Sequence, residues 1–267
     1  RSWSRVPRSD PQFTYAIFDW DNLFASMLSG LVSKEIAYSN IIQSFKSKTA
    51  EGYLANCAGG GYKDQDRTEP PVGAKVLLSL YQRFGDSWLV ELLFDDCLDW
   101  SDWFIRQRLL APLDLIALGS YNERTKQSGD MQTARYESGL DNSPMYDGDF
   151  FNTTSGLMEM YDVGMSSMFV QEAYALAELA DIIGRPDGSQ LRARGDRFRD
   201  LIREHLWDEQ QRVYANRFPN GTFCTRITPT SFYAMQAGAP SDDQAKTMVA
   251  EWLLSPERFC IAPHGDF

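Results

Sequence analysis

Residues 134–147 read ARYESGLDNSPMYD and separate two strongly helical parts of the sequence. Gly139, Asn142, Ser143 and Pro144 favour turns, so this stretch is predicted to interrupt the helices as a loop. Its tyrosine, leucine and methionine side chains are suited to hold the loop against the protein body. An acid beside such apolar walls loses hydration, which raises its pKa toward that of a general acid. The stretch is therefore a candidate catalytic loop, although an acidic loop of this kind is more often only solvated.

Helical patterns fill most of the sequence on both sides of this loop. We expect helices over residues 19–45, 71–85, 86–108, 162–183, 189–206, 230–237 and 241–254. One hairpin is expected around the turn at residues 219–221. A short fixed repeat is absent, which disfavours a solenoid. Paired helices joined by long irregular loops indicate an all-α array in which the loops at one rim build the site.

The composition suits one sizeable globular domain over residues 1–267, or a large part of one, because 43% of the residues are hydrophobic. The net charge is -11, so nucleic acid is not expected as a partner. No apolar run approaches the roughly 20 residues that cross a bilayer, so no membrane partner is expected either. The sequence leaves open the oligomeric state and the compartment, cytoplasm or secretory pathway.

The four cysteines are scattered and the two histidines lie late in the sequence, which argues against a zinc site. We expect buried free thiols at Cys57, Cys97, Cys224 and Cys260, while one or two disulfides remain an alternative.

Residues 137–144, ESGLDNSP, resemble the catalytic-acid signature of the trehalase and processing α-glucosidase I group, glycoside hydrolase family 63. The resemblance covers eight consecutive residues and continues more weakly from about Trp20 to Phe259. It implies an (α/α)6 toroid and hydrolysis with inversion at the anomeric centre. It also implies that Asp141 is the general acid.

Further elements carry the same resemblance. Trp20 and Asp21 are similar to a Trp-Asp pair that contacts the sugar in the family. The sequence DRTEPP at residues 66–71 resembles the family's Arg-x-Gln-Pro-Pro, with Arg67 entering the sugar pocket. Glu69 stands where trehalases have glutamine, which favours the α-glucosidase I-like branch. The implied substrate-binding set is Trp20, Asp21, Asn56, Arg67, Glu69, Tyr136 and Glu137, although Glu137 also fits a role in bracing Arg135 or the loop.

Inversion requires a second carboxyl group as the general base. In the family this base is a glutamate late in the toroid, and the sequence predicts about seven helices where twelve close the ring. We therefore expect the catalytic domain to be incomplete at its C-terminus and the base to lie beyond Phe267. Two carboxyl groups need no cofactor for proton transfer, so no cofactor is expected. No metal ligands are assigned, and a structural calcium ion is left open.

The predicted activity is exo-acting hydrolysis of a terminal α-linked glucose, less readily mannose, from an oligosaccharide or small glucoside. One alternative is a noncatalytic carbohydrate-binding or scaffold protein of the same fold that lacks the base. A second is an unrelated toroid of the terpenoid-cyclase type, whose metal motif is matched by residues 95–99, DDCLD. The same acids, with Asp102, also fit a solvated face of a helix.

Overall fold

The computed structural model describes residues 16–259. The ends of the predicted domain, residues 1–15 and 260–267, and with them Cys260, lie outside the described residues. The helices are α1 Asp19–Ser29, α2 Lys34–Phe45, α3 Gly73–Phe84, α4 Ser87–Gln107, α5 Met131–Tyr136, α6 Val163–Ile182, α7 Gly188–His205, α8 Tyr233–Gln236 and α9 Asp242–Met248. Single turns of 3-10 helix occur at Pro144–Tyr146 and Pro229–Phe232, and a π turn at Val249–Leu253 follows α9.

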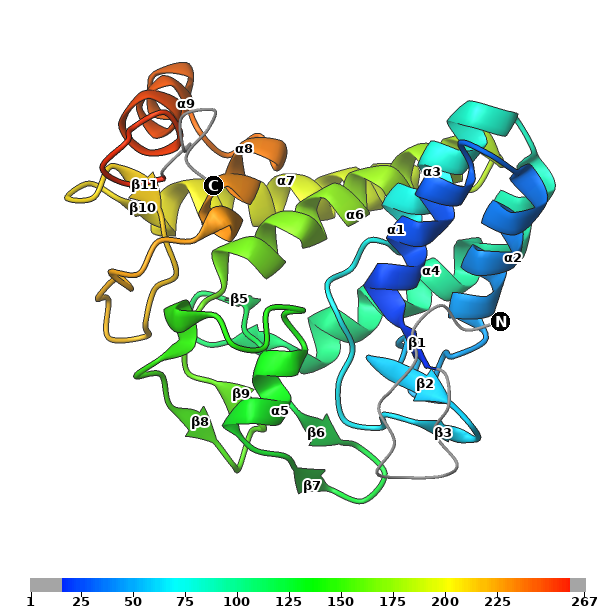
Figure 1. The fold of residues 1–267 in the computed structure, drawn as a ribbon, viewed down its shortest axis with the longest axis horizontal. Coiled ribbons are helices and arrows are strands. Elements are labelled where there is room, and N and C mark those ends of the chain that lie inside the picture. The colour runs from blue at the N-terminus through cyan, green and yellow to red at the C-terminus, as the bar shows by residue number, and fades with distance from the viewer. Residues whose placement is uncertain (1–15, 260–267) are drawn as a thin grey trace, which may run out of the picture.

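The helices form two rows (Figure 1). In the inner row α1 packs on α3, α3 on α6 and α6 on α8, while α2, α4 and α7 cover α1, α3 and α6 from outside. Within the described chain, the row is an open arc, since α1 and α8 at its two ends do not pack on each other. This succession of helical hairpins is the predicted all-α array.

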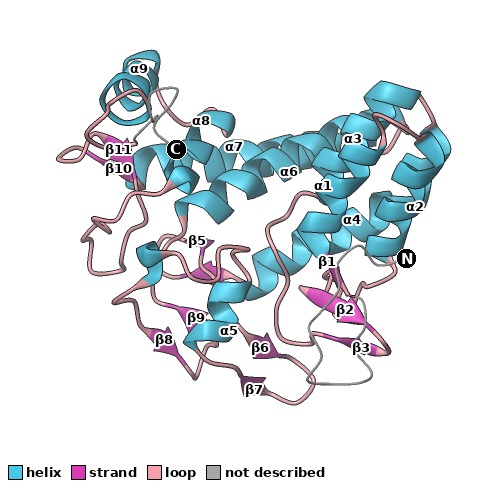
Figure 2. Cartoon of the chain, in the orientation of Figure 1, coloured by secondary structure: helices cyan, strands magenta, loops and turns pink. Residues whose placement is uncertain are grey.

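The N-terminal ends of the inner helices converge. A small cavity is lined by Trp20 at the start of α1, Pro70 before α3, Gly164 at the start of α6 and Tyr233 at the start of α8. Most of the strands and long loops lie on this side of the helices, while β10 and β11 lie beside α9 (Figure 2). The fold therefore brings the loops of four hairpins to one rim.

The expected helix over residues 19–45 is wrong as a single element, because it breaks between Ser29 and Lys34. Ser33 begins α2 as its N-cap, accepting a hydrogen bond from the N–H of Ile36. The apolar pattern continues across the break, but Leu31 is 65% exposed at the turn. The apolar residues at this break therefore belong to a surface turn between α1 and α2, and not to a continuous buried helix face.

The helix boundaries predicted at Gly85, Asp86 and Asp162 are confirmed, whereas α3 begins at Gly73 instead of Pro71 and α8 covers only Tyr233–Gln236 of the expected 230–237. Gly85 ends α3 with a φ of +73°, and Asp86 precedes α4 as its N-cap. Asp162 caps α6 by accepting a hydrogen bond of 2.7 Å from the N–H of Met165.

A second cap joins two inner helices. The buried carboxylate of Glu172, in the middle of α6, accepts hydrogen bonds from the N–H groups of Ala74 (2.6 Å) and Lys75 (3.1 Å). These two N–H groups belong to the first turn of α3, which has no partner for them within the helix. Glu172 therefore fixes the start of α3 against α6.

Short antiparallel strands are more numerous than predicted. They are β1 Ile17–Phe18, β2 Cys57–Gly59, β3 Tyr62–Lys63, β4 Leu109–Leu110, β5 Leu115–Ile116, β6 Tyr121–Asn122, β7 Gln127–Ser128, β8 Phe151–Asn152, β9 Leu157–Met158, β10 Trp207–Asp208 and β11 Val213–Tyr214. The sheet β1-β2-β3 has three strands and the other pairs have two each. Strands of two or three residues are too short to give an alternating pattern, which explains why only the turn at residues 219–221 was expected. That turn sits inside an isolated bridge between Arg217 and Phe223.

The acids of α4 form a salt-bridged outer face, as one of the two interpretations predicted. The ion pairs are Arg185–Asp95 at 3.0 Å, Lys48–Asp99 at 2.8 Å and Arg194–Asp102 at 2.6 Å, and Lys48 also pairs with Asp96. In the part of the chain that the structure describes, no group of His, Cys, Asp and Glu side chains is arranged to hold a metal ion. The terpenoid-cyclase alternative therefore gains no support from DDCLD.

Two further findings concern the described residues. Cys57, Cys97 and Cys224 are free thiols, as expected for these three positions. None of the helices between residues 16 and 259 has both the length and the apolar character needed to cross a bilayer.

Candidate active site

A polar cavity of about 400 Å³ opens on the loop side of the arc. Its lining residues are Phe18, Asn56, Cys57, Tyr62, Asp64, Arg67, Glu69, Tyr136 and Asp141. Five of them, Asn56, Arg67, Glu69, Tyr136 and Asp141, belong to the set expected from the sequence. They come from the loop before α3 and, about 70 residues later in the chain, from the last residue of α5 and the loop that follows it. The fold thus brings together most of the predicted site.

Asp141 lies at the edge of this cavity and is exposed. Its carboxylate forms no hydrogen bond or ion pair with the described residues. The main chain around it is held instead: Gln132 donates to the Asp141 carbonyl at 3.1 Å, and the Ser138 hydroxyl accepts from the N–H of Leu140 at 2.9 Å. The loop therefore presents an unpaired acid on a fixed backbone.

Trp20 and Asp21 begin α1 next to this loop. The Trp20 ring lies against Gly139, so closely that a Cβ on Gly139 would overlap it. Burial raises the pKa of Asp21, and the negative charge of Asp141 adds to the rise. The Trp-Asp pair and the acid loop are therefore neighbours, even though Trp20 itself faces a second cavity.

Arg67 is fixed inside the polar cavity by two acids and an aromatic ring. It donates to Asp64 at 3.0 Å and to Asp66 at 2.9 Å. Its guanidinium carbon lies 5.3 Å from the centre of the Tyr136 ring, a favourable cation–π distance. A cation, acids and a tyrosine around one polar cavity are groups that hydrogen-bond sugar hydroxyls.

Asn56 connects the two loops. Its amide donates to the carbonyl of Thr68 at 3.3 Å and to that of Tyr136 at 3.1 Å. Asn56 therefore uses its amide donors for hydrogen bonds within the protein, and these bonds hold the segment around Arg67 next to the loop that carries Asp141.

Glu137 does not line the cavity. It is completely buried beneath it and is held by Arg108, whose Nε and Nη2 donate at 2.7 and 2.9 Å. The N–H groups of Thr68 (3.2 Å) and Gly119 (2.7 Å) donate to the same carboxylate. Of the roles considered from the sequence, bracing fits this position, with Arg108 as the partner instead of Arg135. Arg135 donates to the carbonyl of Tyr146.

Arg108 was missed by the sequence reasoning, which treated it only as the end of a helix. Its guanidinium also donates to the carbonyl of Asp66 at 3.1 Å and stacks on Trp103, with 4.3 Å from its central carbon to the ring centre. An arginine that ends an amphipathic helix is the only signal in the sequence that could have marked it.

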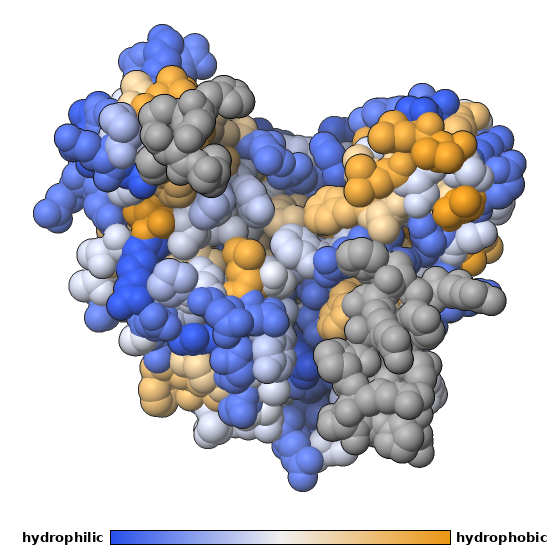
Figure 3. All heavy atoms as spheres, viewed as in Figure 1, coloured by the Kyte–Doolittle hydropathy of each residue, from blue (hydrophilic) through white to orange (hydrophobic). Residues whose placement is uncertain are grey.

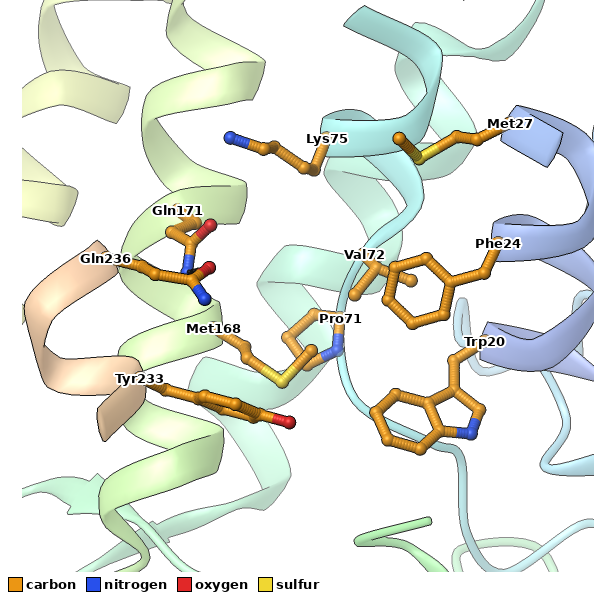
Figure 4. Close-up of a pocket in the computed structure, with 10 residues that line it drawn as sticks. All are labelled: Trp20, Phe24, Met27, Pro71, Val72, Lys75, Met168, Gln171, Tyr233 and Gln236. Carbon is orange, nitrogen blue, oxygen red and sulfur yellow. Dashed lines mark hydrogen bonds between the residues drawn. The ribbon is translucent and has the colours of Figure 1, made fainter. Parts of the chain in front are cut away.

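A second, mainly apolar cavity of about 340 Å³ lies on the inner face of the arc. Figure 3 shows the molecule hollowed between the part formed by α1 to α3 and the part formed by α8 and α9. In the close-up, Trp20, Phe24 and Met27 from α1 face Met168 from α6 and Tyr233 from α8 (Figure 4). Trp20 therefore stands between an apolar chamber and the loop that carries Asp141.

Comparison with known proteins decides the family. The family model described as the mannosylglycerate hydrolase MGH1-like glycoside hydrolase domain matches residues 14–265. The chain belongs to this glycoside hydrolase family. No curated protein sequence matches it significantly.

Solved structures of other glycosidases share the fold of this MGH1-like domain. The GH63 mannosylglycerate hydrolase from Thermus thermophilus, in complex with glucose, is 18% identical with a TM-score of 0.74, over 91% of this chain and 70% of that one. Neutral trehalase Nth1 from Saccharomyces cerevisiae is 14% identical with a TM-score of 0.72, over 92% of this chain and 54% of that one. Identities this low concern the fold alone, and they confirm the expected (α/α)6 glycosidase fold, of which this chain covers a part.

Proposed function

We propose that this MGH1-like domain acts in an inverting, exo-acting α-glycosidase that removes a terminal α-linked glucose from an oligosaccharide or a small glucoside. The observation that carries the proposal is the convergence of Asp141, Arg67 and Tyr136 on one polar cavity. The family and the Thermus enzyme make mannosylglycerate an additional substrate to test.

In this proposal the terminal sugar occupies the polar cavity and Asp141 protonates the glycosidic oxygen as it leaves. Arg67 hydrogen-bonds the sugar hydroxyls and Tyr136 offers an aromatic face to the ring, while Trp20 and Asp21 border the site from the start of α1, next to the loop that carries Asp141. General acid catalysis of this kind contributes roughly 10²- to 10⁴-fold. The fixed backbone around Asp141 supports the orientation that such proton transfer needs.

The base is not assigned to any described residue. The other carboxyl groups that line the cavity are those of Asp64 and Glu69. Asp64 pairs with Arg67 and accepts hydrogen bonds from Tyr62 (2.7 Å) and from the N–H of Cys57 (3.1 Å). Glu69 is buried and accepts from the N–H of Trp20 at 3.0 Å. Neither is free to activate a water.

This shortage of a free second carboxylate among the described cavity residues favours one alternative, a carbohydrate-binding protein of the same fold that does not turn its ligand over. Both proposals use the same pocket, and turnover separates them.

The experiment compares the wild-type protein, Asp141→Asn and the matched control Asp147→Asn on unactivated α-glucosides, trehalose and mannosylglycerate. Proton NMR follows the released sugar and identifies the anomer formed first. We expect Asp141→Asn to lower kcat by about 10²- to 10⁴-fold and Asp147→Asn to change it little. Near-wild-type turnover by Asp141→Asn refutes the assignment of the acid. A wild-type protein that binds a sugar without cleaving any substrate supports the binding protein instead.

A further inference from the structure

Two carboxyl groups, those of Asp19 and Glu69, lie together beneath the first turn of α1. Asp19 is 0% exposed and Glu69 is 4% exposed. Their side chains are within hydrogen-bonding reach of each other. Two buried acids in contact cannot both be ionised without a compensating charge.

One carboxylate oxygen of the pair has no hydrogen-bond donor. Asp19 Oδ2 accepts from the Thr68 hydroxyl (3.0 Å) and from the N–H of Glu69 (3.1 Å), and Glu69 Oε2 accepts from the N–H of Trp20 (3.0 Å). Asp19 Oδ1 is buried and has no donor among the described residues. A proton on Glu69 would supply this donor.

The charged groups around the pair do not neutralise it. In residues 16–259, neither acid forms an ion pair with a lysine or arginine. The neighbouring cation, Arg67, is already paired with Asp64 and Asp66. Asp21, on the same helix turn, adds a further negative charge to the pair, and Asp141, which lines the same cavity as Glu69, acts on Asp21. Burial raises the pKa of the nearby Cys57 thiol to about 12, so this thiol stays protonated.

We propose that Asp19 and Glu69 hold one proton between them, and that this shared proton fixes the backbone of Trp20 and Asp21 at the mouth of the cavity. Glu69 donates the proton to Asp19 while its other oxygen accepts from the N–H of Trp20. Both acids are thus positioning residues. A glutamine at position 69 would make the same donor bond without a titrating proton. The inference goes beyond the proposed function, since it concerns the state of the folded chain and needs no turnover.

The shared proton makes stability depend on pH. Burial raises the pKa of both carboxyl groups, whereas in the unfolded chain they titrate near pH 4. Above that pH the folded state binds one proton more than the unfolded state. The contribution is therefore complete below about pH 4 and is lost as the pH rises from there toward the raised pKa of the pair.

The test is urea unfolding at a series of pH values from about 5 to 9 for wild type, Glu69→Gln and the matched surface control Glu91→Gln. We expect the unfolding equilibrium constant of wild type, relative to Glu69→Gln, to rise by up to about tenfold per pH unit within the range where the pair keeps its proton. Glu91→Gln, which removes one exposed carboxylate, should follow wild type. Parallel pH curves for wild type and Glu69→Gln refute the shared proton.

A second comparison tests the donor itself. Glu69→Ala can neither donate to Asp19 nor accept from Trp20, so we expect it to be less stable than Glu69→Gln at every pH. Equal stabilities of these two variants overturn the proposal.

Discussion

Gly139 lies directly against the indole ring of Trp20, with a backbone φ of +67°. Two physical reasons therefore favour glycine at position 139: the backbone is left-handed, and the Trp20 ring leaves no space for a Cβ. Through this contact, the loop that carries Asp141 and the helix turn that carries Asp21 position each other.

Gly139→Ala is therefore expected to displace Trp20 as well as strain the backbone. We expect a loss of about 1–3 kcal/mol in the free energy of unfolding, together with weaker sugar binding. Gly148→Ala is the matched control, because Gly148 also has a positive φ (+86°) but no neighbour within 4 Å of the position that a Cβ would take. Equal losses of stability and binding in both variants would show that the contact with Trp20 has no importance. Urea unfolding and calorimetric titration measure the two effects.

Removal of the Trp20 ring tests the proposed sugar site directly. We expect Trp20→Ala to weaken glucose binding at least about tenfold, which corresponds to about 1.4 kcal/mol. Trp88→Ala is the control, since Trp88 is 49% exposed at the start of the outer helix α4. Unchanged affinity in Trp20→Ala would exclude this ring from the sugar site.

The Arg108–Glu137 pair predicts a large effect on stability. Each side chain is at most 1% exposed, so deletion of one leaves the other charge buried without its partner. Glu137→Ala is expected to lower the free energy of unfolding by about 3–5 kcal/mol. The contrasting pair Arg226–Asp147 is about half exposed on both sides, and Asp147→Ala should cost at most about 1 kcal/mol. Comparable costs in urea unfolding would contradict this prediction.

Glu172 predicts a separate pH dependence. Burial raises its pKa to about 7, so the folded state keeps a proton that the unfolded state releases near pH 4.5. Its contribution to stability is complete below about pH 4.5, falls by about 3 kcal/mol as the pH rises to about 7, and is then constant. Glu172→Gln should remove this slope, while Glu178→Gln, an exposed change on the same helix, should keep it. A wild-type slope in Glu172→Gln would be the contrary result in the unfolding series.

The sequence predicted the end of α3 and the start of α6 because local chemistry sets these two helix ends. Gly85 ends α3 and Asp162 caps α6, each through contacts within its own helix end, whereas the Asp86 carboxylate accepts from the Tyr38 hydroxyl and pairs with Lys34 instead of capping α4. The break between α1 and α2 was not predicted, since an apolar pattern through Leu28 and Leu31 does not tell which residues meet a core.

The candidate site was also predicted only in part. Asp141, Arg67 and Tyr136 share a cavity, but only the family signature connected them, because periodicity carries no distances between loops. Arg108 could not be assigned a role because its partner Glu137 is 29 residues away and its other contacts are backbone carbonyls and a ring. The contact between Asp19 and Glu69 joins residues 50 positions apart, so the sequence pattern could not predict it either.

The four donors to Glu137 also limit how the acid loop can move. Glu137 lies only four residues before Asp141, and its carboxylate joins that loop to Thr68, Arg108 and Gly119. A hinge at this point would have to break a buried ion pair, so the loop is unsuited to act as a lid that closes over a ligand. The protein side of the pocket is instead preorganised, and a sugar should meet a site whose acid is already in place.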